Sequence, residues 1–208
     1  MLFNIPIPSL FICFLIFIVW MHYEKRKSDK KQAQASQKFW QREEEANHAR
    51  NRDISDLPLF VPLEGDIPFP ETTDENAVYY QKRVRDSLEL PMKNLSKYSN
   101  TDLKLAYGVG NFKTLSEYDA NFNNFLMNLS NLGSAYHAIG LYEEAADIFR
   151  YCLICGSEKA RDYKALADAY VSMGNSGRIS ELITEVENSE LPRKSTLVES
   201  LRAIQKSS

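Results

Sequence analysis

The pattern of apolar and polar residues divides the chain into an apolar N-terminal segment, a polar stretch and a long patterned region. Residues 2–21 hold no charged side chain, and every residue from Leu10 to Met21 is apolar. From Ala77 onward apolar residues recur at spacings of three and four, which is the pattern of one helix face. No alternating strand pattern of useful length occurs after residue 74. The pattern therefore predicts an all-α protein with one apolar segment near its N-terminus.

Residues 2–21 predict a membrane-spanning helix. A bilayer core is crossed by about 20 predominantly apolar residues, and Trp20 and Tyr23 stand where an interfacial aromatic belt is expected. A cleaved secretory signal would need basic residues before the apolar run and a small-x-small cleavage site after it. Here the basic residues follow the run, in "EKRKSDKK" over 24–31. We therefore expect an uncleaved transmembrane anchor over residues 1–23.

Charge is distributed unevenly along the chain. Residues 24–31 carry five basic and two acidic side chains, whereas the chain from Ile54 onward carries sixteen basic and twenty-two acidic ones. Because basic flanks stay on the cytoplasmic side of a membrane, we expect a single-pass protein of the cell membrane whose C-terminal domain is cytoplasmic. The overall net charge of -3 gives no reason to expect a nucleic-acid partner.

Two segments join the anchor to the patterned region. Residues 24–52 are rich in good helix formers but lack a continuous apolar stripe, which is typical of a spacer helix. We interpret them as a charged helical stalk, with Phe39 and Trp40 as a candidate contact point. Residues 53–74 contain four prolines, which disfavour a helix. This segment is predicted to be an extended connector whose apolar side chains lie on the body.

Residues 75–208 are predicted to form a helical domain. A first helix is followed by Pro91, and a second begins at the cap-type residues Asn100 and Thr101 and ends at Gly108. The glycine-containing stretch "YGVGNF", 107–112, is interpreted as a corner between helices. A longer helical pattern follows, marked by Leu115, Tyr118, Phe122, Phe125, Leu129, Leu132 and Tyr136.

The domain contains an internal repeat. Five positions recur at a separation of 34 residues, namely Leu132, Gly133, Ala135, Tyr136 and Gly140 with Leu166, Ala167, Ala169, Tyr170 and Gly174. Closely packed antiparallel helices need a small residue where their backbones approach, which Gly133 and Ala167 supply. Gly140 and Gly174 are expected to end the first helix of each pair, because glycine adopts positive φ at little cost.

This pattern resembles the tetratricopeptide repeat, a 34-residue helix–turn–helix unit. The first copy, over about 126–159, matches six signature positions, namely Leu129, Leu132, Gly133, Tyr136, Ala145 and Phe149. The second, over about 160–193, departs from the pattern because Ile179 replaces the usual alanine. Residues 193–206 resemble a terminal capping helix. The layout as a whole resembles single-pass, membrane-anchored tetratricopeptide proteins of bacteria. Whether residues 75–125 form a diverged earlier helix pair stays open.

The resemblance implies stacked helix pairs with a concave surface that accepts a peptide or a helix of a partner protein. In the family, the side chains that line this surface come from the first helix of each pair. The candidate partner-binding residues carried over in this way are Ser130, Ser134, His137, Arg161, Lys164 and Asp168. Some members bind a C-terminal carboxylate with a basic clamp, but Asp168 opposes Arg161 and Lys164 here, so carboxylate capture is not predicted.

No constellation of catalytic residues, cofactor motif or metal-ligand set is evident. Cys152 and Cys155 form a C-x-x-C near the predicted end of an amphipathic helix, whereas a redox motif lies at a helix start. A structural zinc site needs four ligands, and no second pair is present. We therefore interpret these cysteines as packing residues and His137 as a surface residue.

Two functions remain open at this level. The first is a membrane-tethered scaffold, without catalysis, that binds a partner through the concave helical surface. The second is a structural or assembly subunit of a membrane complex, held by its span and its connector. The oligomeric state stays open in both.

Overall fold

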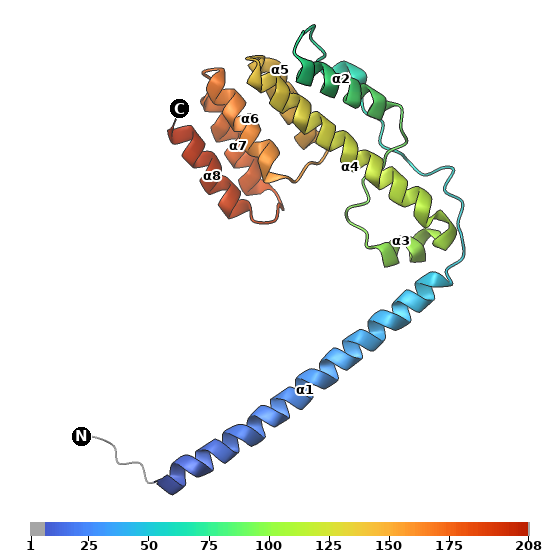
Figure 1. Cartoon of the computed structure of the whole chain (residues 1–208), viewed down its shortest axis with the longest axis vertical. Helices are drawn as coiled ribbons and strands as arrows, with labels where there is room; N and C mark the ends of the chain where they lie inside the picture. Colours follow the sequence, from blue (N-terminus) through green and yellow to red (C-terminus); the bar gives the residue numbers. More distant parts are fainter. Residues whose placement is uncertain (1–6, 208) are drawn as a thin grey trace, which may run out of the picture. The chain divides into compact units, whose positions relative to one another are not determined.

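The computed structural model describes residues 7–207, with side chains from Phe11 onward apart from that of Glu64 (Figure 1). The described residues form helices and no strand, so the predicted all-α class is confirmed. The helices are α1 (Ile7–Asn47), the short 3₁₀ helix η1 (Glu64–Asp66), α2 (Glu75–Leu88), α3 (Asn100–Tyr107), α4 (Val109–Ala138), α5 (Tyr142–Ile154), α6 (Ala160–Ser172), α7 (Gly177–Asn188) and α8 (Lys194–Lys206).

The helices belong to two compact units. The first, which we call the stalk unit, comprises Met1–Ile54 and Tyr98–Phe112. The second, the body unit, comprises Ser55–Lys97 and Lys113–Ser208. Within the residues that the structure describes, no helix holds a stretch long and apolar enough to cross a bilayer. The first residues of the predicted anchor, 1–6, lie outside the described range.

In the stalk unit, α1 runs without a break because the sequence has neither glycine nor proline from Ser9 through Leu57. The last turns of this helix lie against α3. Arg42 donates to Asp102 at 2.6 Å, and Lys104 donates to Asn47 at 2.9 Å. Glu45 stands three residues from Arg42 on the same helix, yet the guanidinium bonds a carboxylate sixty residues away on α3.

The glycine-containing stretch "YGVGNF" forms the predicted corner, between α3 and α4. Gly108 has a φ of 89°, and a Cβ there would lie 2.4 Å from the Cα of Asn51. A Cβ on Gly110 would lie 2.4 Å from the side-chain nitrogen of the same asparagine, whose oxygen accepts a hydrogen bond from the Gly110 amide at 2.8 Å. The backbone of Asn51 and the positive φ therefore require glycine at 108, whereas a side chain at 110 would displace only the side chain of Asn51. The cap of α3 is Ser99, in a capping box with Asp102, one residue before the expected Asn100.

In the body unit, the proline-rich connector lies on helices. The amide of Phe60 donates to the carbonyl of Met92 at 2.8 Å, and the Phe60 ring meets Phe122 edge to face at 5.2 Å between centroids. Ile67 is buried in the core. The hydroxyl of Tyr136 donates to the carbonyl of Pro68 at 3.0 Å. The connector thus supplies both core side chains and acceptors for buried donors.

Positions 34 residues apart occupy equivalent places in the body unit. Leu132 and Leu166 are fully buried, as are Tyr136 and Tyr170 within a few per cent. Positive-φ glycines follow the first helix of each pair, with φ of 83° at Gly140 and 70° at Gly174. Helix α6 packs against α5, α7 and α8 (Figure 1). Helices α4 to α8 therefore share one continuous core, to which α8 contributes Leu197, Val198 and Leu201.

Candidate functional site

A small hollow opens between α4, α5 and α6 in the body unit. It has a volume of about 130 Å³ and is lined by Ser134 and His137 from α4, Phe149 from α5, and Ala165 and Asp168 from α6. Its floor is apolar, because Phe149 belongs to the core, and its rim is polar. We call it the α4–α6 hollow. Three of the six predicted partner-binding residues line it, and two others, Arg161 and Lys164, are exposed on α6.

Arg161 reaches from α6 across to α4. Its guanidinium donates to the side-chain oxygen of Asn131 at 3.2 Å and to the hydroxyl of Ser134 at 3.1 Å. The Ser134 hydroxyl in turn donates to the carbonyl of Ser130 at 2.9 Å. Both acceptors of the guanidinium are uncharged, so these bonds fix its direction without neutralising its positive charge. Asn131 was not among the predicted residues, although it stands four positions after the exposed Met127.

His137 and Asp168 form the other side of the rim. The Nε2 atom of His137 lies 3.1 Å from the hydroxyl of Ser172, and its ring meets Tyr142 edge to face at 5.1 Å. Partial burial raises the pKa of the Asp168 carboxyl, against the opposing effects of His137 and Lys164, which lower it. The hollow therefore presents a carboxylate that is incompletely solvated beside two basic side chains.

Ser130 does not lie on this surface. It is 3% exposed, and its hydroxyl donates to the carboxylate of Asp162, which is 1% exposed and also accepts from Ser157. The prediction that Ser130 meets a partner is therefore corrected, because its hydroxyl links α4 to the first turn of α6. The periodicity of α4 did not reveal this, since the partner carboxylate stands 32 residues later.

Cys152 lies in the core of the body unit and Cys155 packs against it. Cys152 is fully buried in the core, and burial raises the pKa of its thiol well above the usual value. Burial also raises the pKa of Cys155 to about 11. Because the thiolate is the nucleophile and the metal ligand, burial disfavours the reactive form of both thiols. Among the described residues, no group of three or more His, Cys, Asp or Glu side chains is placed to hold a metal.

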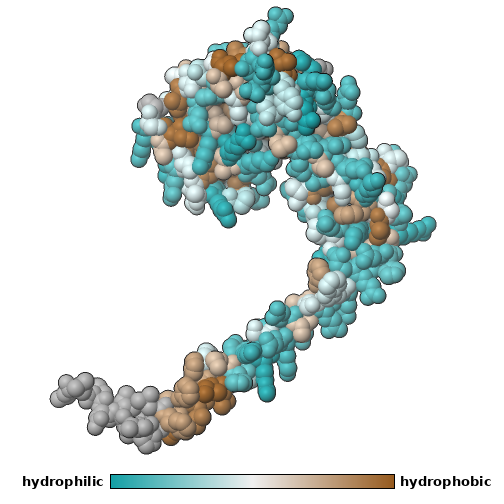
Figure 2. Space-filling model, in the orientation of Figure 1, coloured by the Kyte–Doolittle hydropathy of each residue, from teal (hydrophilic) through white to brown (hydrophobic). Residues whose placement is uncertain are grey.

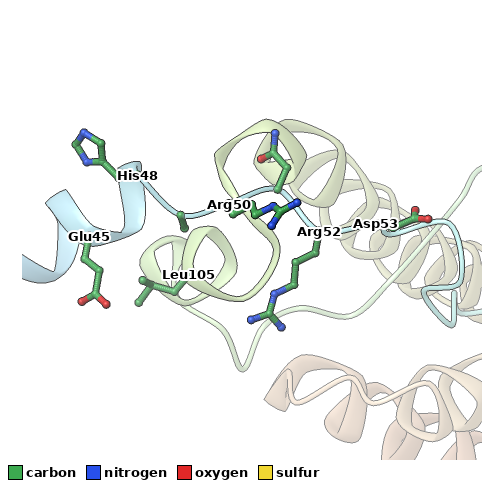
Figure 3. A pocket seen from close by; sticks show the side chains of 8 residues that line it. Glu45, His48, Arg50, Arg52, Asp53 and Leu105 are labelled. Carbon is green, nitrogen blue, oxygen red and sulfur yellow. The ribbon is translucent and has the colours of Figure 1, made fainter.

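A wider hollow of roughly 800 Å³ lies in the stalk unit (Figure 3). It is lined by Glu45, His48, Ala49, Arg50, Asn51, Arg52, Asp53 and Leu105. Figure 3 shows that these side chains diverge, with His48 and Glu45 on opposite sides of their helix. A binding site needs polar groups that converge on a ligand, and this hollow does not provide them.

A scan against family models, a search of the curated proteins and a search of the solved structures each found no match for this chain. The features of this protein that could meet a partner are therefore the α4–α6 hollow and the exposed surfaces of the two units.

Proposed function

We propose that this protein is a membrane-tethered scaffold that binds a segment of a partner protein at the α4–α6 hollow and carries out no catalysis. The observation that supports this proposal is the bridge from Arg161 to Asn131 and Ser134. Such a bridge holds a charged, directional donor at the mouth of a hollow with an apolar floor. Convergent polar groups over an apolar floor are the usual makeup of a recognition site.

The proposal includes an array of tetratricopeptide type, with α4–α5 and α6–α7 as its two helix pairs and α8 as its cap. The buried and glycine positions that recur at 34-residue spacing support it. The close contact of Gly133 with α5 supports it further, because a Cβ there would lie 2.9 Å from the ring of Phe149. In such arrays the first helices of successive pairs line one concave surface. Residues of α4 and α6 line the hollow in the same manner.

The membrane tether rests on the exposed apolar surface of α1. Large apolar side chains are exposed along this helix, at Phe11, Ile12, Phe14, Leu15, Ile16, Phe17, Val19, Trp20, Met21 and Tyr23. We call these residues the apolar band, and they appear as the hydrophobic stretch of α1 in Figure 2. An exposed apolar surface of this extent marks a membrane or protein contact. Its ring-like distribution around one helix favours lipid, which surrounds a helix on all sides.

A cross-linking pull-down from native membranes tests the hollow. The bait is the full chain, compared with a variant carrying Arg161→Ala, Lys164→Ala and Asp168→Ala. A control variant carries Lys82→Ala, Arg83→Ala and Asp86→Ala, which are exposed residues with the same two signs of charge on α2. We expect the wild type and the control to capture at least one protein that the hollow variant does not capture. An identical set of captured proteins for all three baits would exclude the hollow as the binding surface.

A second candidate function is an assembly subunit that contacts its complex through the connector. The exposure of Leu59, Val61 and Leu63, at 38%, 77% and 64%, favours it. These residues alternate with Phe60 and Pro62, so they share one face of an extended segment. Val61→Ser and Leu63→Ser would then abolish capture in the same pull-down, while the hollow variant would bind normally.

A further inference from the structure

The residues that follow the apolar band on α1 form an exposed basic cluster. Lys25, Arg26, Lys27, Lys30 and Lys31 all belong to α1, and all five side chains are exposed. Glu24 and Asp29 lie among them, which leaves a net charge of +3 over residues 24–31. The basic cluster therefore follows the apolar band on α1, with Glu24 between them.

The charge of the basic cluster is hardly compensated within the protein. Among the described residues, the one ion pair that the cluster makes joins Lys27 to Glu24 at 4.0 Å, and both side chains are about half exposed. Exposed pairs of this kind contribute little and are screened by salt. By contrast, the basic residues at the other end of α1 are bound. Arg42 contacts Asp102 of α3 at 2.6 Å.

The spacing along the helix places the basic cluster at the depth of lipid headgroups if the apolar band lies in a bilayer. A helix rises about 1.5 Å per residue, so Lys25 stands about 3 Å and Lys31 about 12 Å beyond Tyr23. The aromatic residues Trp20 and Tyr23 mark the interface on this side. Electrostatic screening has a length of about 8–10 Å at physiological ionic strength. Lys25, Arg26 and Lys27 therefore fall within the range of the surface charge of an anionic leaflet.

We propose that the basic cluster binds the headgroups of anionic phospholipids, so that this protein prefers negatively charged membranes over neutral ones. The proposal rests on the proposed function, since it requires the apolar band to lie in a bilayer. The apolar band supplies attachment to any bilayer, and the basic cluster supplies the preference for charge. Each basic residue near an anionic surface increases the affinity about fivefold. Glu24 lies in the same range, so the three basic residues leave two net positive charges and a preference of roughly 25-fold.

The test uses the full chain with Trp40→Phe, which leaves Trp20 as the one remaining tryptophan. Its fluorescence shifts to the blue when the apolar band enters lipid. The protein is titrated with vesicles of phosphatidylcholine alone and of phosphatidylcholine with one-quarter phosphatidylglycerol, and the lipid concentration at half-binding is measured by flotation. We expect a blue shift with both vesicles and a half-binding concentration roughly 25-fold lower with the anionic ones. Raising the salt to about 1 M shortens the screening length to about 3 Å and should remove most of the difference.

The decisive variant carries Lys25→Gln, Arg26→Gln and Lys27→Gln. Its control loses the same net charge from exposed positions of the body unit, through Lys82→Gln, Arg83→Gln and Lys97→Gln. We expect the decisive variant to bind both vesicles equally and the control to keep the anionic preference. Equal binding of the wild type to both vesicles would overturn the lipid preference and leave the anchor intact. An absent blue shift with either vesicle would overturn the anchor itself, and an equal loss in both variants would assign the preference to total charge.

Discussion

Replacing Gly133 by alanine tests the close packing of α4 on α5. A Cβ at this position would lie 2.9 Å from two ring atoms of Phe149 and 3.0 Å from the Cγ2 atom of Ile148. Both neighbours are buried, at 1% and 0% exposure, so neither side chain has a free path into solvent. The new methyl group must therefore displace the Phe149 ring, separate the helices, or both.

The expected cost follows from two opposing effects. Overpacking a well-packed core costs about 1–3 kcal/mol. Alanine is favoured over glycine inside a helix by about 0.8–1 kcal/mol, which offsets part of that cost. We expect Gly133→Ala to reduce the free energy of unfolding by about 1 kcal/mol and Gly133→Leu to reduce it by more. For a chain of this size, 1 kcal/mol lowers the midpoint of thermal unfolding by about 2–4 °C.

Circular dichroism of the full chain in detergent micelles measures the midpoint. The matched control is Gly177→Ala in α7, where a Cβ would meet nothing within 4 Å. We expect that control to be neutral or slightly stabilising. Adding Phe149→Leu to Gly133→Ala should recover part of the loss, because the smaller side chain makes room for the methyl group and the two changes are then non-additive. A Gly133→Ala protein as stable as the Gly177→Ala control would refute the close approach of the two helices.

Four further predictions follow from individual contacts. Burial raises the pKa of Asp168 in the folded state, so its ionised carboxylate destabilises the protein above that pKa. Asp168→Asn should therefore raise the midpoint of thermal unfolding at pH 7. This gain should vanish below about pH 4, where the carboxyl is protonated in the folded and the unfolded protein. Ser130→Ala should lower stability by about 1.5–3 kcal/mol, measured by urea unfolding, since it removes a hydrogen bond to a buried carboxylate. Cys155, with a pKa of about 11, should alkylate far more slowly with iodoacetamide at pH 7.5 in the folded than in the unfolded protein, as mass spectrometry would show. Gly110→Ala should displace the side chain of Asn51 and increase tryptic cleavage beside it, and adding Asn51→Ala should restore protection.

The helices were predictable because their signals are local. Apolar residues at spacings of three and four mark the buried face of a helix, whichever element packs against that face. Gly140 and Gly174 mark helix ends through their own backbone conformation, which needs no knowledge of the tertiary structure. The 34-residue separation of Tyr136 and Tyr170 also follows from sequence alone. These features depend on the chain itself and so appear in a single sequence.

The partners of individual polar residues were not predictable, because they depend on contacts between distant segments. The helical pattern places Ser130 on an exposed face, but its hydroxyl donates to the buried carboxylate of Asp162. Arg42 had a carboxylate nearby on its own helix, yet it binds Asp102 of α3. The sequence predicts a corner at Gly108 and Gly110. Asn51, the residue that both glycines face, stands more than fifty residues earlier in the chain. Periodicity identifies the face on which a side chain lies and leaves the group opposite it undetermined.

The basic cluster and the far end of α1 should be electrostatically independent. Residues 24–47 of α1 rise about 36 Å along the helix axis, which is roughly four screening lengths at physiological ionic strength. For a helix that leaves the bilayer along its axis, the potential of an anionic leaflet is therefore negligible at the contact between Arg42 and Asp102 of α3. Arg42→Gln should accordingly change the midpoint of thermal unfolding by the same amount in neutral and in anionic nanodiscs, while the affinity for the membrane itself differs between them. A change that depends on lipid charge would mean that α1 lies along the membrane surface instead of leaving it.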